Sequence, residues 1–413
     1  MVEGQEGQMT QPKMDRHFSI DAIRGIAVMG ILLMNIQAFA MVFAAYQFPQ
    51  VHMDFTGANR DVWFYAHVFF NMKFITIFSA LFGAGIVLML GEDKQASLGV
   101  HYRRMLWLLL IGLIHAWVFW AGDILVPYAV MGMLVVLARR MKPMGLTIMG
   151  IALILLTGGL MALGFAFLPM MSPEDLESMR PSAETVAATV AVYQAGFIDR
   201  FGANASLTMM AETMQLTFFA GRLAGVMFVG MALYKWGFLT LRWSFLRYLV
   251  TAIIALGIGL PACWYGTNHL LETDFALDQF WVGETINYFA SLLVALGYAA
   301  VVMLLCKLGP ALRLILHPFA AVGRMAFTNY LTHTLVLTFI FVGTPGLGMM
   351  GEVERVGQFQ IVVAIWVFQL IFSTIWLSMF RFGPMEWVWR SLTYWKFQPM
   401  RKSVAGAPPP TPA

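Results

Sequence analysis

The chain has 413 residues, of which 60% are hydrophobic and 12% are charged, and its formal net charge is +4. A soluble domain carries about 25% charged residues, so a chain this poor in charge cannot cover a surface that faces water. These values exclude an ordinary soluble protein. The small basic excess is typical of the cytoplasmic side of a membrane protein, and we expect no nucleic-acid partner.

Apolar segments of about twenty residues, the length that crosses a bilayer, follow one another along the chain. They predict an all-α, polytopic membrane helical bundle with about ten transmembrane helices. The predicted spans are 18–43, 63–90, 104–120, 123–139, 145–168, 206–235, 245–265, 287–307, 319–342 and 359–380. The second and the sixth are long enough to be tilted, kinked or extended beyond the bilayer.

The connections between these spans alternate in charge. One set, which includes both chain ends, carries Lys and Arg, and the other set carries Asp and Glu. Because positive loops stay in the cytoplasm, both ends are predicted to be cytoplasmic. We expect a tail over 1–17, a single transmembrane domain over 18–396 and a disordered Pro-rich tail over 397–413. The outer loops 169–205 and 267–286 are long enough for short amphipathic helices.

Polar residues inside apolar spans are costly and therefore indicate function or buried pairing. Asp21 and Arg24 share one face of the first helix, either as an interfacial ion pair or with Arg24 as a phosphate ligand. Asn35 follows in the same helix, as a helix–helix hydrogen-bonding residue or a substrate contact. Lys73, in the second span, requires a buried partner or a water-filled cavity, and structural pairing and substrate contact both remain open.

His115 and Asp123 bracket a tight outer hairpin between the third and fourth spans, in the stretch HAWVFWAGD. One interpretation makes Asp123 a helix cap and His115 a core residue. The other makes His115 a general base whose ring Asp123 orients. The two interpretations are compatible, because a capping carboxylate can also orient a ring.

A second polar set lies in the later spans and supplies further candidate substrate contacts. Its members are Arg222, Arg324, Asn329 and His333. No cluster of His and Cys has metal-ligand spacing, so we expect no metal. Cys263 and Cys306 fall near opposite ends of neighbouring helices, and we expect no disulfide.

Five stretches in chain order resemble the YeiB family, bacterial inner-membrane proteins with the domain of unknown function 418. They are FSIDAIRGIAVMGILLMN (18–35), KFITIFSALFGAG (73–85), GLIHAWVFWAGDILVPYA (112–129), VGRMAFTNYL (322–331) and GPMEWVWRSLTY (383–394). The first stretch is also similar to the opening of the heparan-alpha-glucosaminide N-acetyltransferase group. The resemblance implies a multi-pass protein of the bacterial inner membrane.

That wider resemblance implies a transmembrane acyltransferase that takes an acyl group from cytosolic acyl-CoA and passes it to an acceptor at or beyond the membrane. Arg24, Arg103, Arg104 and Arg390 are the candidates for binding the CoA phosphates, because guanidinium groups bind phosphate bidentately. A transporter of a small anionic or lipidic solute and a non-catalytic membrane protein are the alternatives. Membrane lipids and an unknown acceptor are the other expected partners, and a homodimer is left open.

Overall fold

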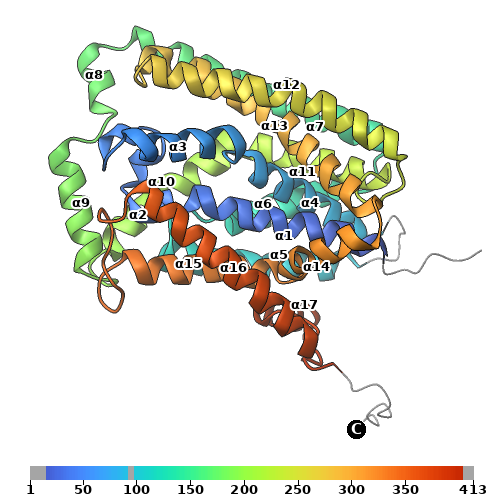
Figure 1. Ribbon diagram of the computed structural model, residues 1–413. Helices are drawn as coiled ribbons and strands as arrows, with labels where there is room; N and C mark the ends of the chain where they lie inside the picture. The colour runs from blue at the N-terminus through green and yellow to red at the C-terminus, as the bar shows by residue number, and fades with distance from the viewer. Residues whose placement is uncertain (1–14, 92–96, 403–413) are drawn as a thin grey trace, which may run out of the picture.

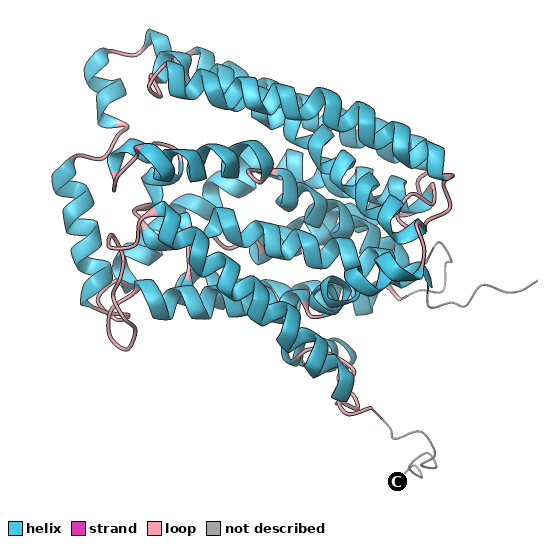
Figure 2. Cartoon of the chain, in the orientation of Figure 1, coloured by secondary structure: helices cyan, strands magenta, loops and turns pink. Residues whose placement is uncertain are grey.

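The computed structural model describes residues 15–91 and 97–402, and these form helices joined by short connections, without a β-strand (Figure 2). The predicted all-α, polytopic membrane bundle is confirmed. Residues 1–14, 92–96 and 403–413, with most of the predicted N-terminal tail, Lys94 and most of the Pro-rich tail, lie outside the described residues.

Eight segments of the described chain are long and apolar enough to cross a membrane, and they lie side by side in one bundle (Figure 1). They consist of α1 (Asp15–Asn35) with α2 (Gln37–Ala40), α3 (Gly57–Phe69) with α4 (Lys73–Leu90), α5 (Leu98–Ile114), α7 (Pro143–Ala166), α10 (Phe201–Met214) with α11 (Ala220–Lys235), α12 (Phe245–Glu272), α13 (Leu277–Lys307) and α16 (Arg355–Met379). Two shorter apolar helices, α6 (Leu125–Val135) and α15 (Ala326–Phe341), complete the predicted set.

The remaining helices lie at the two ends of the bundle. They are α8 (Pro173–Ser178), α9 (Ala183–Ala195), α14 (Pro310–Arg324) and α17 (Pro384–Tyr394). The helices α8 and α9 occupy the outer loop where short helices are predicted. The prediction of a second long loop over 267–286 is wrong, because α12 continues to Glu272 and α13 begins at Leu277. Both helices are longer than a bilayer requires, so they extend their polar residues beyond it.

Two predicted spans are interrupted within their length. The second breaks between α3 and α4, where Met72 adopts a left-handed backbone conformation. The sixth passes from α10 to α11 through a π-helical turn over Gln215–Phe219. The ninth predicted span, 319–342, crosses a helix boundary at Met325, so its first residues belong to α14.

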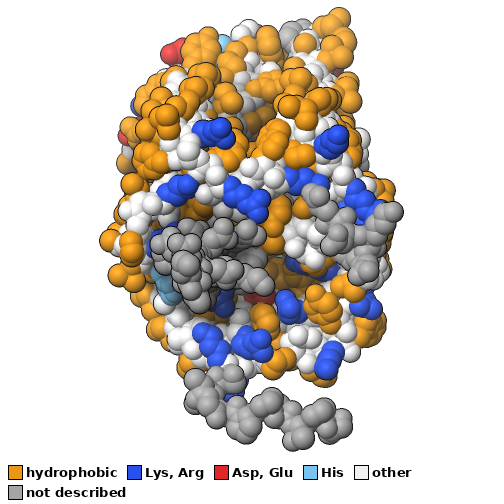
Figure 3. Space-filling view, turned by 90° about the vertical axis from the view of Figure 1, so that its right-hand side faces the viewer, with side chains coloured by type: hydrophobic (Ala, Val, Ile, Leu, Met, Phe, Trp, Pro, Cys, Tyr) orange, Lys and Arg blue, Asp and Glu red, His pale blue; other side chains and the backbone are white. Residues whose placement is uncertain are grey.

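The end of the bundle at which α1 begins and α13 passes into α14 is basic. Figure 3 looks onto this end and shows Lys and Arg side chains gathered among apolar ones. The helices α8 and α9 lie at the opposite end (Figure 1). The rule that positive segments stay inside predicts that this basic end faces the cytoplasm.

The helices α1 and α14 cross in direct backbone contact at Gly25 and Gly323. A Cβ atom on Gly25 would lie 1.9 Å from the Phe319 carbonyl oxygen, and one on Gly323 would lie 1.8 Å from the Asp21 carbonyl oxygen. Only glycine permits this approach. The crossing places Arg24 and Arg324, each next to one of these glycines, in the wall of one cavity.

Candidate active site at the junction of α5, α6 and α15

His115 and Asp123 are in contact at the turn between α5 and α6. The helix α5 ends in a π-helical turn over His115–Phe119, a form that is frequent at functional sites. The turn brings the His115 Nδ1 atom within 2.6 Å of the Asp123 Oδ1 atom. The side chains are 3% and 0% exposed, so this pair lies away from water. The contact that the sequence predicts is therefore present, while the catalytic role of the pair stays a prediction.

Asp123 uses its two carboxylate oxygens for different tasks. Its Oδ1 atom faces His115, and its Oδ2 atom accepts a hydrogen bond of 2.8 Å from the Val126 backbone N–H. The second bond satisfies a free N–H at the start of α6, as an N-cap does. Both interpretations of Asp123, as a helix cap and as the residue that orients the ring, therefore fit the geometry.

The other ring nitrogen of His115 contacts a hydroxyl group on a third helix. The His115 Nε2 atom lies 2.8 Å from the Thr334 Oγ1 atom of α15, and Thr334 is also buried. Since the Asp123 carboxylate accepts from the Nδ1–H group, the Nε2 atom of the neutral ring is free to accept the Thr334 proton. The result is a buried carboxylate–imidazole–hydroxyl chain.

Helix α10 covers this turn on the side away from the basic end. Arg200 donates to the Val118 carbonyl oxygen at 3.0 Å, and Asn204 and Thr208 both donate to the Ala116 carbonyl oxygen. These bonds satisfy carbonyl groups that the end of α5 leaves free. The hairpin, which the sequence places at the outer surface, is therefore buried beneath α10.

Helix α10 also brings a second carboxylate into the neighbourhood. Both Glu212 carboxylate oxygens are buried and have no hydrogen-bond partner among the described residues, and Glu212 lies near enough to Asp123 for the two side chains to influence each other. Gln215, at the start of the second π-helical turn, donates to the Asp123 carbonyl oxygen at 3.1 Å. The two π-helical turns of the described chain thus meet around Asp123.

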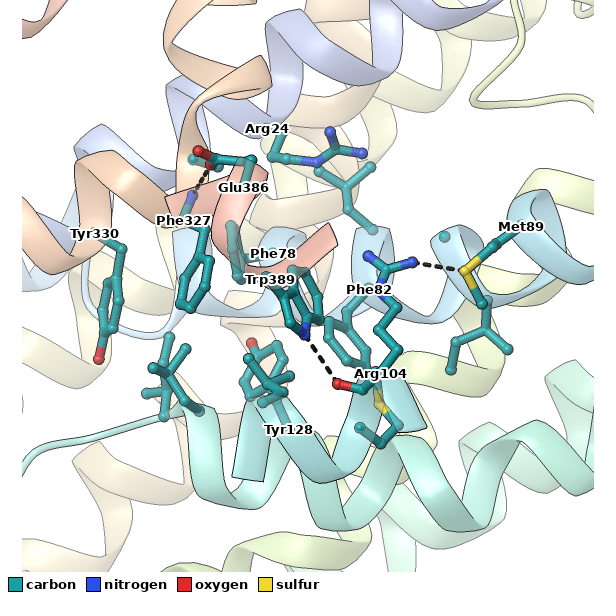
Figure 4. A pocket seen from close by; sticks show the side chains of 18 of the residues that line it. Arg24, Phe78, Phe82, Met89, Arg104, Tyr128, Phe327, Tyr330, Glu386 and Trp389 are labelled. Atoms are coloured by element: carbon teal, nitrogen blue, oxygen red, sulfur yellow. Dashed lines mark hydrogen bonds between the residues drawn. The ribbon is translucent and has the colours of Figure 1, made fainter. Parts of the chain in front are cut away.

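A cavity of about 220 Å³ leads from the basic end toward this site (Figure 4). Arg24, Arg104 and Arg324 lie in its wall together with His101. Its middle is apolar, and its other end is closed by residues that include Tyr330 and Leu125. The Tyr330 ring centroid is 5.4 Å from that of His115, so one side chain separates the cavity from the histidine.

Arg104 is held in place at the mouth of the cavity. Its guanidinium group lies 4.2 Å from the centroid of the Trp389 ring, and its Nη1 atom donates to the Met89 sulfur at 2.8 Å. The Trp389 indole N–H in turn donates to the Arg104 carbonyl oxygen at 2.9 Å. No carboxylate lies within ion-pair distance of Arg104 in the described chain. Its charge is therefore available to an anion.

Glu386 of α17 fixes the start of α15, which carries Tyr330 and Thr334. One of its oxygens accepts from the backbone N–H groups of Phe327 and Thr328 at 2.7 and 3.1 Å. Burial raises the pKa of Glu386, and the hydrogen bonds from Thr328 oppose that rise. A carboxylate at a helix N-terminus also complements the helix dipole. The helix that bears the hydroxyl group is thus anchored from the basic end.

Comparison with known proteins identifies relatives over nearly the whole chain. YeiB of Escherichia coli (strain K12) is 30% identical over 389 residues, which are 92% of this chain and 97% of YeiB. YxaH of Bacillus subtilis (strain 168) is 31% identical over 93% of this chain and 96% of its own length. The chain belongs to the YeiB family. Both relatives are described as uncharacterized proteins.

The family described as "Protein of unknown function (DUF418)" matches residues 233–396. This part of the YeiB-family chain contains Thr334 and Glu386, while His115 and Asp123 lie before it. The predicted likeness to the acetyltransferase group has no counterpart among these relatives and stays an expectation.

Other predicted contact residues of this YeiB-family chain are held in structural bonds. The Lys73 ammonium group donates to the His67 carbonyl oxygen and to the Asn287 Oδ1 atom, at 2.8 and 2.7 Å. It thereby satisfies a free carbonyl at the end of α3. Lys73 is fully buried, faces the bundle interior as predicted, and is absent from the cavity wall.

Asn329 and His333 form a separate polar string between α15 and α16. Asn329 donates to Ser373 at 3.1 Å, and the His333 Nε2 atom lies 2.9 Å from the Gln369 Oε1 atom. The predicted pair of Asp21 and Arg24 is present, with a distance of 3.0 Å. Asn35 ends α1, half-buried.

Two of the predicted phosphate ligands point away from the cavity. The Arg103 Nε atom donates to the Thr393 carbonyl oxygen, and Arg390 lies over the rings of Phe382 and Tyr394. Neither residue lies in the cavity wall. Arg103 and Arg104 are neighbours in the sequence, but only Arg104 reaches the cavity.

A second cavity, of about 180 Å³, lies beside the first and shares Ile124 and Tyr128 with it. Arg222 lies in its wall and donates to the Tyr288 carbonyl oxygen at 2.6 Å and to the hydroxyl groups of Thr76 and Ser291. Within the described chain no carboxylate lies within ion-pair distance of Arg222. Arg222 is therefore a buried cation beside a cavity.

Proposed function

We propose that the chain is a membrane acyltransferase that takes an acyl group from acyl-CoA at the basic end of the bundle and passes it to an acceptor at or beyond the membrane. The observation that carries the proposal is the buried His115–Asp123 pair, 2.6 Å apart, which lies behind Tyr330 at one end of a cavity whose other end holds three arginines. A general base and a phosphate-binding mouth are the two elements that such a reaction requires.

The chemistry of the pair suits acyl transfer. The neutral His115 ring accepts a proton from a hydroxyl or amine group as that group attacks a thioester carbonyl. Asp123 holds the ring in the required tautomer and stabilises the imidazolium that forms. The site is buried, and electrostatic stabilisation is stronger where water is excluded.

The dimensions of the cavity suit an acyl-CoA donor. Arg104 and His115 belong to one helical segment and are separated by eleven residues, so they lie about 16 Å apart along its axis. An extended pantetheine arm places the thioester at a comparable distance from the CoA phosphates. The apolar middle of the cavity would hold the arm, and the arginines would hold the phosphates.

Transport of a small anionic solute is the second candidate function. Arg222 supports it, because an intramembrane cation that faces a cavity is a typical anion contact. The acyltransferase proposal is preferred because it also uses the His115–Asp123–Thr334 chain, for which an anion carrier has no evident need.

The acyltransferase proposal predicts different effects for two neighbouring arginines. Arg104→Ala should weaken the binding of acetyl-CoA about 10- to 100-fold, the usual worth of a hydrogen bond to a charged group. Arg103→Ala should leave the affinity nearly unchanged, because its side chain contacts Thr393. Isothermal titration of the purified protein in detergent measures both values.

The consumption of acyl-CoA should require His115 in addition to the arginines that bind the CoA phosphates. His115→Ala should reduce acyl-CoA consumption about 10²–10⁴-fold while acetyl-CoA still binds, with a membrane extract as the source of acceptor. Two results would contradict the proposal. One is a folded wild-type protein that binds no acyl-CoA, and the other is a His115→Ala variant that consumes it at the wild-type rate.

A further inference from the structure

We propose that Thr334 is the nucleophile of the reaction and carries the acyl group as an ester between donor and acceptor. This inference rests on the proposed acyltransferase function and specifies its chemistry. The geometry points to a double-displacement reaction, in which CoA leaves before the acceptor reacts.

The first observation is the buried chain from Asp123 through His115 to Thr334. Its two contacts are 2.6 and 2.8 Å long, and all three side chains are at most 3% exposed. A nucleophile within hydrogen-bonding distance of a base, with the base oriented by a third group, is the arrangement that activates a hydroxyl group. Catalytic triads are recognised by this geometry and not by the order of their residues in the chain.

The second observation is the hydrogen-bond partner of the Thr334 hydroxyl group, which is unusual for a threonine inside a helix. A threonine inside a helix commonly donates to the carbonyl four residues earlier. Thr332, on the same helix, does so, with a bond of 2.8 Å to the Thr328 oxygen, and Thr374 bonds to Leu370 in the same way. The Thr334 hydroxyl instead faces His115 on another helix. It is thus available for proton transfer.

The third observation is the position of Thr334 relative to the cavity. Tyr330 lies one helical turn before Thr334, on the same face of α15, and its ring closes the end of the cavity. Its hydroxyl group is buried, lies near the Ile124 backbone and donates to no acceptor among the described residues. A thioester at this end would reach Thr334 once the Tyr330 side chain moves aside, and the Tyr330 O–H group would then be placed to donate to the thioester carbonyl oxygen.

The two half-reactions balance. In the first, the Thr334 oxygen attacks the thioester carbonyl as His115 accepts the hydroxyl proton. The C–S bond then breaks, and the thiolate leaves as CoA-SH with that proton. In the second, an acceptor hydroxyl or amine gives its proton to His115 and attacks the Thr334 ester. The acyl–oxygen bond breaks, Thr334 regains a proton from His115, and the acylated acceptor leaves.

An acyl-threonine intermediate would also mean that donor and acceptor do not have to occupy the buried site at the same time. His115 is buried beneath α10, and the cavity approaches it from the basic end. Donor and acceptor would use the same base in succession, so that both need not reach Thr334 at once.

The test uses the whole purified protein without an acceptor. A double-displacement enzyme exchanges isotope-labelled CoA into acyl-CoA, whereas a direct-transfer enzyme does not. Acetyl-CoA and octanoyl-CoA are the probes, and mass spectrometry of acid-quenched peptides locates the adduct. We expect exchange, and an acyl group on Thr334 that alkaline hydroxylamine removes.

Two variants and a matched control complete the design. Thr334→Val should abolish the adduct and reduce exchange to that of a protein-free sample, while Thr334→Ser should retain both. Thr338→Val is the control, because Thr338 lies one turn further along α15, is also buried, and its hydroxyl group has no partner among the described residues. It should leave both signals unchanged.

The outcomes separate this inference from the proposed function. Binding of acyl-CoA and its His115-dependent consumption with membrane extract, without exchange or adduct, would overturn the covalent step and leave the acyltransferase standing. An adduct on another residue would overturn the assignment to Thr334. Absence of binding and of consumption would remove the proposed function together with this inference.

Discussion

The Asp123 carboxylate makes two hydrogen bonds, one that caps α6 and one to the His115 ring. Asn at position 123 can still accept from the Val126 N–H, because Asn caps helices about as well as Asp. It then presents an amide N–H group to the His115 Nδ1 atom, which forces the wrong tautomer and removes the charge that stabilises the imidazolium.

We therefore predict that Asp123→Asn lowers acyl-CoA turnover by more than tenfold while the melting temperature stays close to that of the wild type. Thermal unfolding in detergent and the turnover assay measure the two effects. A variant with normal turnover would assign Asp123 to capping alone.

Whether the sequence alone predicts a contact between two site residues depends on how far apart they lie in the chain. His115 and Asp123 are eight residues apart around one hairpin, so the sequence alone predicts their contact. Thr334 lies 219 residues from His115, and only the packing of α15 against the α5–α6 turn brings them together. Glu212 lies inside a predicted span, and its acidic side chain is the one signal that would have drawn attention to it.

At the scale of elements, the crossing of α1 and α14 is determined by glycine. Gly323→Ala places a Cβ atom 1.8 Å from the Asp21 carbonyl oxygen, so the two helices must separate. We predict a loss of about 1–3 kcal/mol in the free energy of unfolding, as for other overpacked contacts. Gly257→Ala is the matched control, because its Cβ atom meets nothing within 4 Å. Thermal unfolding of both variants is the measurement, and equal melting temperatures would show that the crossing is not tight.

The connection between α2 and α3 contains His52, a histidine whose protonation should make stability depend on pH. The His52 Nδ1 atom accepts from the Val42 N–H at 3.1 Å, and burial, with Arg355 nearby, lowers the pKa of His52 below its ordinary value of 6.5. Because the pKa of His52 is lower in the folded protein than in the unfolded chain, His52 contributes to the stability of the fold above pH 6.5. That contribution is lost as the pH falls through the lowered pKa.

We predict a fall in the wild-type melting temperature as the pH is lowered from 7.5 to 5, and a shallower fall for His52→Asn. The Asn side chain offers an acceptor near the position of the Nδ1 atom but does not titrate. Parallel curves for the two proteins would exclude His52 as the titrating group.

The sequence predicts the helices well and their ends less well, for a physical reason. A long apolar segment in lipid must satisfy all its backbone hydrogen bonds internally, so it folds as a helix. For this reason the predicted spans all correspond to helices. The boundary at Met325 is not visible in hydropathy, because Arg324 is the one Lys, Arg, Asp or Glu residue within the predicted span 319–342. The break before Lys73 depends on contacts with α13, which a local pattern does not contain.

At the scale of the whole molecule, the charge asymmetry predicts which end faces the cytoplasm. Ser97→Cys, at the basic end, should react with a membrane-impermeant maleimide only after the cells are permeabilised. Glu184→Cys, at the start of α9, should react in intact cells. Cys263 and Cys306 are free but buried, so they should contribute little background. The reverse labelling pattern would invert the topology.

The basic end also has a kinetic consequence. Its Lys and Arg side chains are spread among apolar ones over this face (Figure 3), and the wall of the cavity adds three arginines. Such a field concentrates anions near the mouth and increases association rates by about 10–10³-fold. Screening over a Debye length of about 8 Å at physiological ionic strength weakens that attraction. An anionic ligand should therefore arrive faster in dilute buffer than in strong salt, while its departure, governed by contacts inside the cavity, changes far less.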